Sequence, residues 1–110
     1  MHQEQTTPPQ NPVQDHAIPL DAAGTLYGLF RERVRRTPDG LAYRQYERDD
    51  KQWREHDWRS VADLAARMQV ALGREDLQLG DRVAIMLRNS IEWSAFDQAT
   101  LGLGLVLVPL

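Results

Sequence analysis

Two stretches near the end of the sequence are apolar without alternation, and they constrain the fold more than any other feature. The first is a predicted strand from Arg82 to Leu87, and the second lies within LGLGLVLVPL, residues 101–110. A strand that is apolar on both faces must be buried on both, which is typical of the parallel sheets of α/β proteins. A helical segment, IEWSAFDQATLG, separates the two. The order strand, helix, strand predicts a parallel βαβ unit.

The rest of the sequence supplies too few elements to cover such a sheet. Three expected helices and a hairpin would cover one face at most, and the closing strand would keep an apolar edge, which natural proteins avoid. We therefore expect an α/β fold with an incomplete sheet, forming the first part of a larger domain. Ligands of open α/β sheets bind outside the carboxyl ends of the strands, so the catalytic motifs are expected beyond Leu110.

Each of the three expected helices has a candidate N-cap. Thr25 precedes LYGLFRERVRR, which ends at Thr37-Pro38. Ser60, with Asp63 in the position of a capping box, precedes the second helix, and Asn89 or Ser90 caps the third.

Apolar periodicity gives the buried face expected for each helix. The first should bury Leu26, Leu29, Phe30 and Val34. The second should bury Val61, Leu64, Ala65, Met68 and Leu72. In the third, a stripe of small residues should let the helix approach the sheet closely; it consists of Ala95, Ala99 and Gly102.

The segments LAYRQYE (41–47) and WREHDW (53–58), separated by RDDKQ, predict an antiparallel β-hairpin. Its acidic residues are candidates for acid–base chemistry or Mg²⁺ binding, but no further ligand stands at a suitable spacing. Their positions favour solvated charges of a turn and of edge strands. They are Asp49, Asp50, Glu55 and Asp57.

Other candidates for chemistry also have simpler interpretations. The first helix carries a basic cluster that could bind phosphate, but cations stabilise a helix C-terminus in any case; its members are Arg31, Arg33, Arg35 and Arg36. Gly102 and Gly104 follow a helix and open a strand, the reverse of a dinucleotide fingerprint, which favours helix termination. The histidines lack a nucleophile at a recognisable spacing and are expected at the surface; they are His2, His16 and His56. The absence of Cys excludes a disulfide framework and a cysteine nucleophile.

The beginning of the sequence differs from the remainder in composition. Residues 1–22 are rich in Gln, Pro and Thr and are expected to form a flexible leader, while residues 23–110 form the first part of the domain. No signal peptide or membrane span is expected, and the lack of Cys fits a cytoplasmic protein. With a net charge of −3, the chain has no general attraction for nucleic acid, and we expect none as a partner.

The ordered motifs of residues 25–110 resemble the N-terminal region of the AMP-binding, adenylate-forming enzymes. The resemblance rests on TLYGLFRERVRRTPDGLAYR, WRSVADLAARMQVALG and LQLGDRVAIMLRNSIEWSAFDQATLGLGLVLVPL. The form Asn-x-x-Glu-Trp at 89–93, and the hairpin that ends in Trp58, look most similar to long-chain fatty-acid–CoA ligases. Leu103 and Leu105 depart from the family, which more often has small residues there.

The resemblance implies the N-terminal part of the large domain of a ligase that uses ATP, Mg²⁺ and coenzyme A to activate a fatty acid, with peripheral membrane contact left open. The family's phosphate loop and its Thr-Glu motif do not occur in residues 1–110. We therefore assign no catalytic, cofactor-binding or metal-binding residue and expect no activity from this segment alone. A peptide-synthetase adenylation domain and a non-catalytic α/β interaction module remain as alternatives.

Overall fold

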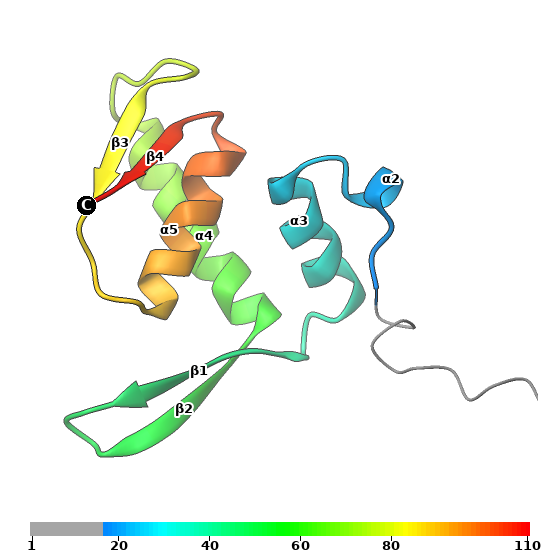
Figure 1. Cartoon of the computed structure of the whole chain (residues 1–110), viewed down its shortest axis with the longest axis vertical. Helices are drawn as coiled ribbons and strands as arrows, with labels where there is room; N and C mark the ends of the chain where they lie inside the picture. Colours follow the sequence, from blue (N-terminus) through cyan, green and yellow to red (C-terminus); the bar gives the residue numbers. More distant parts are fainter. Residues whose placement is uncertain (1–16) are drawn as a thin grey trace, which may run out of the picture.

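The computed structural model describes residues 17–110 (Figure 1). Its elements are α2 (Leu20–Ala23), α3 (Leu26–Arg36), β1 (Leu41–Glu47), β2 (Gln52–Asp57), α4 (Trp58–Gly73), β3 (Arg82–Ile85), α5 (Ile91–Gly102) and β4 (Val106–Pro109). Most of the expected leader lies outside the described residues. The short helix α2 includes its last three residues and ends at Gly24, whose φ is 70°.

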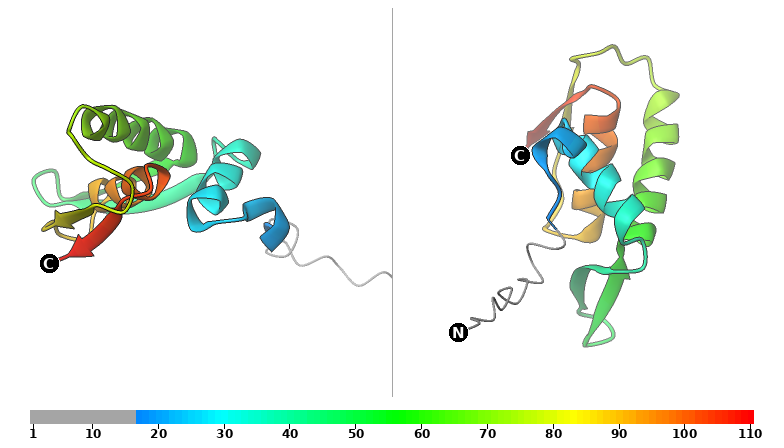
Figure 2. Two further views of the ribbon diagram at one scale, coloured as in Figure 1. Left: turned by 90° about the horizontal axis from the view of Figure 1, so that it is seen from above. Right: turned by 90° about the vertical axis from the view of Figure 1, so that its right-hand side faces the viewer.

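The chain forms three layers, which are clearest from above in Figure 2. Helix α5 lies in the middle, with α4 on one side and the pair β3–β4 on the other. Helix α3 packs against both α4 and α5, and the hairpin β1–β2 extends from the end of the bundle at which α4 begins (Figure 1).

The parallel βαβ unit is confirmed. Strands β3 and β4 pair in parallel, with Arg82 opposite Val106 and Ile85 opposite Pro109, and α5 connects them. The first strand was expected to reach Leu87, but it ends at Ile85. The ladder ends after a last bond from the Leu110 N–H to the Ile85 carbonyl oxygen (2.9 Å).

The sheet is incomplete, as expected. Ile85 and Leu105 are buried beneath α5, whereas Val106 is 47% exposed and Met86, just past the strand, is 79% exposed. Within residues 17–110 nothing covers the second face of this pair, where Arg82, Ala84 and Val106 are exposed.

A hydrophobic core lies between the three long helices, in addition to the buried Ile85 and Leu105 at the strand pair. Its buried residues are Phe30, Val61, Ala65, Ile91 and Ala95. The small-residue stripe of α5 therefore faces α4 and α3, which corrects the expectation that it faces the sheet. A Cβ atom on Gly102 would overlap the side chains of Tyr27 and Gln69, so close approach between these helices requires glycine there.

The buried faces of α3 and α4 match the sequence only in part. In α4, Val61 and Ala65 are buried and the rest of the predicted stripe is half-buried. In α3, however, Leu26 is 71% exposed and Leu29 is 42% exposed. Tyr27 packs in their place, with its ring centroid 6.4 Å from that of Phe30.

Two of the three predicted caps are confirmed. The Thr25 hydroxyl accepts a hydrogen bond from the Gly28 N–H (2.9 Å), and the Ser90 hydroxyl accepts one from the Trp93 N–H (3.2 Å). The prediction that Ser60 caps the second helix is wrong. Asp57 is the cap, and its carboxylate accepts from the Ser60 N–H (2.8 Å).

The earlier start of α4 follows from the hairpin, whose strands have the predicted antiparallel pairing. Strand β2 runs to Asp57, opposite Leu41, and the chain enters the helix directly. The first two N–H groups of α4, those of Trp58 and Arg59, donate to the carbonyl oxygens of Gly40 (3.1 Å) and Pro38 (2.8 Å). These bonds satisfy donors that a helix start otherwise leaves open.

Candidate functional site

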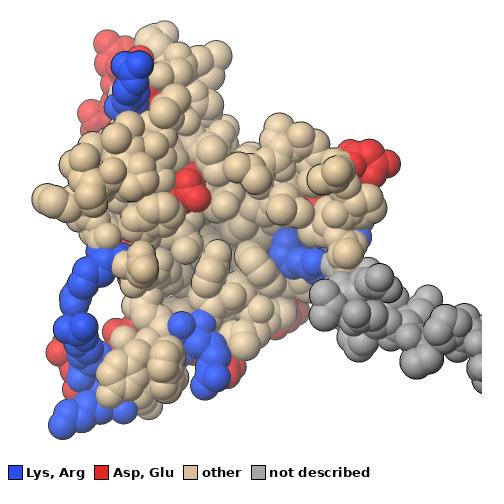
Figure 3. All heavy atoms as spheres, viewed as in Figure 1, with Lys and Arg blue, Asp and Glu red and all other residues tan. Residues whose placement is uncertain are grey.

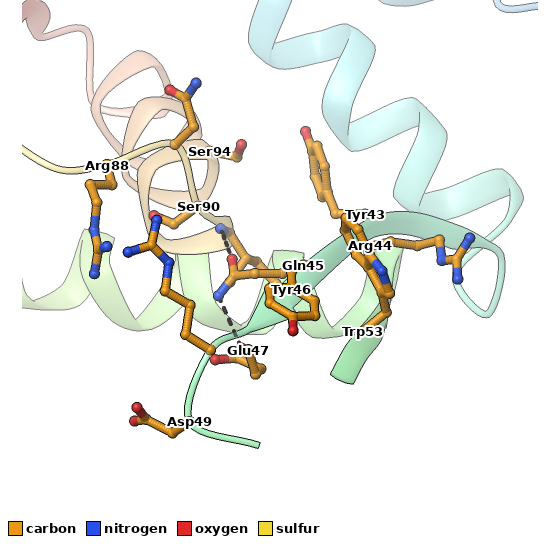
Figure 4. Close-up of a pocket in the computed structure, with 13 residues that line it drawn as sticks. Tyr43, Arg44, Gln45, Tyr46, Glu47, Asp49, Trp53, Arg88, Ser90 and Ser94 are labelled. Carbon is orange, nitrogen blue, oxygen red and sulfur yellow. Dashed lines mark hydrogen bonds between the residues drawn. The ribbon is translucent and has the colours of Figure 1, made fainter. Parts of the chain in front are cut away.

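A large hollow among the described residues lies at the carboxyl end of β3. Its volume is about 730 Å³, and its walls are the hairpin, mainly β1 and the turn after it, and the segment 88–94 (Figure 4). That segment contains the end of the loop after β3 and the first turn of α5. This is the edge at which open α/β sheets bind ligands.

One side chain joins the two walls of this hollow. The Oε1 atom of Gln45 accepts a hydrogen bond from the N–H of Ile91, the first residue of α5, at 2.7 Å. Its Nε2 atom donates to Oε1 of Glu47 at 3.0 Å, as Figure 4 shows. Gln45 thus holds the hairpin against the N-terminus of α5 and fixes the width of the hollow.

Three arginines line the hollow, and they differ in their surroundings. The guanidinium of Arg44 lies 3.8 Å from the carboxylate of Glu55 and 5.7 Å from the centre of the Trp53 ring. The side chains of Arg48 and Arg88 make no ion pair or hydrogen bond with any residue of the range 17–110. The hollow therefore contains two guanidinium groups whose donors are open to solvent or a ligand.

A second hollow of about 440 Å³ lies between α3 and α5, beside Trp58, and its lining is mostly apolar. Leu26 and Leu29, the exposed leucines of α3, form part of it. Burial raises the pKa of the Asp97 carboxyl group at its edge. The neighbouring Gln98 has a buried Oε1 atom with no hydrogen-bond partner in the described part of the chain.

The basic cluster of α3 makes local contacts. Glu32 forms ion pairs with Arg35 and, at 2.9 Å, with Arg36. Arg33 donates to the Thr37 hydroxyl (3.4 Å), and Arg31 lies over the Tyr27 ring at 5.9 Å. The hydrogen bonds from Arg35 and Arg36 lower the pKa of Glu32 to about 2. These contacts favour a surface charge network over a phosphate site.

The hairpin carboxylates also have structural roles. Asp50 pairs with Arg54 and Glu55 with Arg44, while Asp57 caps α4. Asp49 lies in the turn as predicted and is exposed. No group of three His, Cys, Asp or Glu side chains gathers anywhere in residues 17–110.

The remaining sequence candidates give a mixed result. Gly104 has a φ of 70° just after α5, and its N–H donates to the Leu101 carbonyl oxygen (3.1 Å), so helix termination is confirmed. His56 was expected at the surface but is half-buried, and its Nε2 has no hydrogen-bond partner among the described residues. His2 and His16 lie outside the described residues.

Sequence reasoning missed Gln45 and Arg88, because no motif indicates a chemical role for either residue. Gln45 acts on an amide 46 positions away, so no local spacing reveals it. The one available signal for Arg88 is its position just after an apolar strand, where loop residues of α/β proteins reach the ligand edge.

Within the described range, no helix combines the length and the apolar composition needed to cross a membrane.

Comparisons of the sequence and of the structure with known proteins indicate the same family. A family described as AMP-binding enzyme matches residues 30–110. A fatty acyl CoA synthetase of Mycobacterium tuberculosis is 27% identical over 82% of this chain and 17% of its own, with a TM-score of 0.68. The N-terminal subdomain of NpsA from Klebsiella oxytoca is 29% identical over 77% of this chain and 21% of its own, with a TM-score of 0.64.

An artificially fused adenylation–PCP di-domain of a peptide synthetase, NpsA-ThdA from Klebsiella oxytoca, is 30% identical over 74% of this chain and 14% of its own, with a TM-score of 0.64. The chain thus spans about a fifth or less of the length of these three structures. No curated protein matches the sequence.

Proposed function

The chain belongs to the family of AMP-binding enzymes, and we propose that it forms the N-terminal part of an ATP-dependent ligase that joins a long-chain fatty acid to coenzyme A. The observation that carries the proposal is the likeness to the fatty acyl CoA synthetase, which extends over 82% of the chain. The motif Asn89-x-x-Glu92-Trp93, at the loop and first turn that line the hollow, supports the same subgroup.

The proposed reaction has two steps. The carboxylate of the fatty acid attacks the α-phosphorus of ATP, and pyrophosphate leaves to give the acyl-adenylate. The thiol of coenzyme A then attacks the acyl carbon, loses its proton and displaces AMP, which yields the thioester. Mg²⁺ would neutralise charge on the phosphate oxygens during the first step.

The described residues do not form a Mg²⁺ site, because no three acidic or histidine side chains meet among them. Our proposal therefore places the ATP, metal and coenzyme A sites in the remainder of the enzyme. The role we propose for this chain is structural. It supplies two neighbouring strands of the large sheet and the loop at their carboxyl edge.

A peptide-synthetase adenylation domain is the second candidate, because the similarity to NpsA-ThdA is comparable in identity and TM-score. Both candidates share the first chemical step and differ in the second. An adenylation domain passes its acyl group to a carrier-bound thiol, whereas the proposed ligase uses coenzyme A. A non-catalytic interaction module is disfavoured by the match to an enzyme family over residues 30–110.

The decisive experiment uses the polypeptide that contains these residues in its full natural length. With ATP, Mg²⁺ and coenzyme A, we expect it to convert a long-chain fatty acid to acyl-CoA, and with coenzyme A left out it should stop at the adenylate. ATP–pyrophosphate exchange reports the first step, and mass spectrometry of the thioester reports the second. Exchange with an amino acid, without any acyl-CoA, would assign the peptide-synthetase function and overturn this proposal.

We further propose that the enzyme resides in the cytoplasm, where ATP and coenzyme A are available. Fractionation of the source cells, followed with an antibody to this chain, tests this. Recovery in a secreted or periplasmic fraction would contradict it. Recovery with membranes, reversed by salt, would instead reveal peripheral contact.

A further inference from the structure

We propose that the hollow between the hairpin and the start of α5 binds a phosphate group between the guanidinium groups of Arg48 and Arg88. This inference concerns residues of this chain alone and does not depend on the ligase proposal. It rests on the shape of the hollow, on the two unpaired cations in its lining and on the position of the hollow in the fold.

The two arginines come from different elements that meet only in the folded chain. Arg48 opens the turn after β1, and Arg88 lies in the loop after β3. Both line the hollow, and Figure 4 shows Arg88 on the wall opposite Tyr46 and Glu47. A ligand in the hollow would therefore have a cation on either wall. The hydrogen bond of Gln45 to Ile91 holds these walls together.

The donors available in the hollow suit a phosphate group. A guanidinium offers a planar fork that matches two oxygens of a phosphate. Neither Arg48 nor Arg88 uses its fork on another residue of the described range, although Arg44 beside them is paired with Glu55. Ser90 and Ser94, which also line the hollow, add hydroxyl groups that can donate to the remaining oxygens.

The carboxylates near the hollow do not prevent an anion from binding between the arginines. Glu47 already accepts a hydrogen bond from the Gln45 amide at 3.0 Å, and Figure 4 shows Asp49 farther out along the turn than Glu47. Three arginines and these two carboxylates line the hollow, and Arg44 is paired with Glu55, which lies outside the lining. Figure 3 shows Lys and Arg side chains gathered over this end of the hairpin and along the edge above it.

The test measures how fast each arginine reacts with phenylglyoxal, a reagent for guanidinium groups, by mass spectrometry of the resulting peptides. The protein is used in its natural full length, in millimolar inorganic phosphate or in chloride of equal ionic strength. We expect Arg48 and Arg88 to react at least about threefold more slowly in phosphate. The internal controls are Arg67 of α4 and Arg74, its C-cap residue; both are exposed and outside the hollow, and they should react equally fast in both solutions.

Two variants separate a shared site from two independent surface charges. In Arg88→Gln, phosphate should no longer protect Arg48, while the control variant Arg74→Gln should leave the protection unchanged. Both positions are exposed, so circular dichroism should show the same fold. Equal slowing at all four arginines, or protection of Arg48 that survives Arg88→Gln, would overturn the proposal.

Phosphoserine as a second probe identifies the source of the phosphate. Protection by both probes means that the site accepts a phosphate ester, as on a nucleotide or a modified side chain. Protection by inorganic phosphate alone means that it takes the free ion. Protection by acetate as strong as that by phosphate would refute a phosphate site and show that the arginines respond to any anion.

Discussion

The meeting point of α3, α4 and α5 should not tolerate even one added methyl group at Gly102. A Cβ atom placed there would lie 2.7 Å and 2.8 Å from two ring carbons of Tyr27, and closer still to Nε2 of Gln69. Ordinary contacts between such atoms are about 3.5–4.0 Å. In Gly102→Ala, therefore, the Tyr27 ring and the Gln69 amide must both move, or α5 must shift away from its neighbours.

The expected cost follows from what these side chains do. Overpacking a filled site costs about 1–3 kcal/mol. Moving Gln69 also weakens its bonds to Tyr27 Oη (3.1 Å) and to the Ala99 carbonyl oxygen (3.4 Å), each worth about 0.5–1.5 kcal/mol. Replacing Gly by Ala in a helix returns up to about 1 kcal/mol. We expect the free energy of unfolding to fall by about 1–3 kcal/mol on balance.

The sequence offers a matched control at the end of the neighbouring helix. Gly73 is the last residue of α4, as Gly102 is of α5, but a Cβ atom there would meet nothing within 4 Å. Gly73→Ala should therefore stabilise the protein by about 0.5–1 kcal/mol. Urea unfolding of both variants, with unchanged m values, measures the difference.

A second substitution tests whether the clash with Gln69 causes the expected loss of stability in Gly102→Ala. If the clash with Gln69 contributes, Gly102→Ala should cost less in a Gln69→Ala background, by about 0.5–1.5 kcal/mol. If Gly102→Ala is as stable as Gly73→Ala, the helices do not approach as closely as described, and the reasoning fails.

Three further substitutions test the contacts around this core. Arg35 and Arg36 lower the pKa of Glu32 from 4.5 to about 2, so the stability that these ion pairs add is present above pH 4.5 and lost as the pH falls towards 2. Acid titrations of stability should show that Glu32→Gln removes this pH dependence, whereas an unchanged dependence of stability on pH would contradict the ion pairs. Asp57→Ala should reduce stability and speed hydrogen exchange in the first turn of α4, because its carboxylate is the cap; unchanged exchange would rule this out. Gln45→Ala should speed exchange of the first α5 amide by about tenfold, with the amides of β3 as the unaffected reference.

The sequence predicts well those features that depend on neighbours along the chain. Thr25 and Ser90 were identified as caps because a cap acts on an amide three residues away, and both bonds are present. Ser60 was assigned wrongly because Asp57 and Ser60 are both good caps and lie three residues apart. The choice between them depends on where β2 ends and on carbonyl groups at positions 38 and 40, which no helical pattern contains.

The buried faces show a second limit. Periodicity identifies which residues of a helix can share a face, but it does not say which neighbour covers that face. Ala95, with its small neighbours on α5, was expected against the sheet and packs against helices. Leu26 and Leu29 have the right spacing for a core face, but they are exposed and border a hollow between α3 and α5.

The candidate site shows why the position of a site is easier to predict than its residues. Two apolar strands in parallel are enough to identify the ligand edge, since their carboxyl ends must lie together. The side chains at that edge depend on the hairpin, which reaches it through a ring contact of Tyr43 with Trp58 (5.9 Å between centres) and the bond of Gln45 to Ile91. In the sequence nothing distinguishes Arg48 from other turn residues. In the folded chain these two contacts place its turn at the same hollow as Arg88. A change that loosens either contact should therefore weaken phosphate binding without touching an arginine, and Gln45→Ala examined by the phenylglyoxal experiment is the direct comparison.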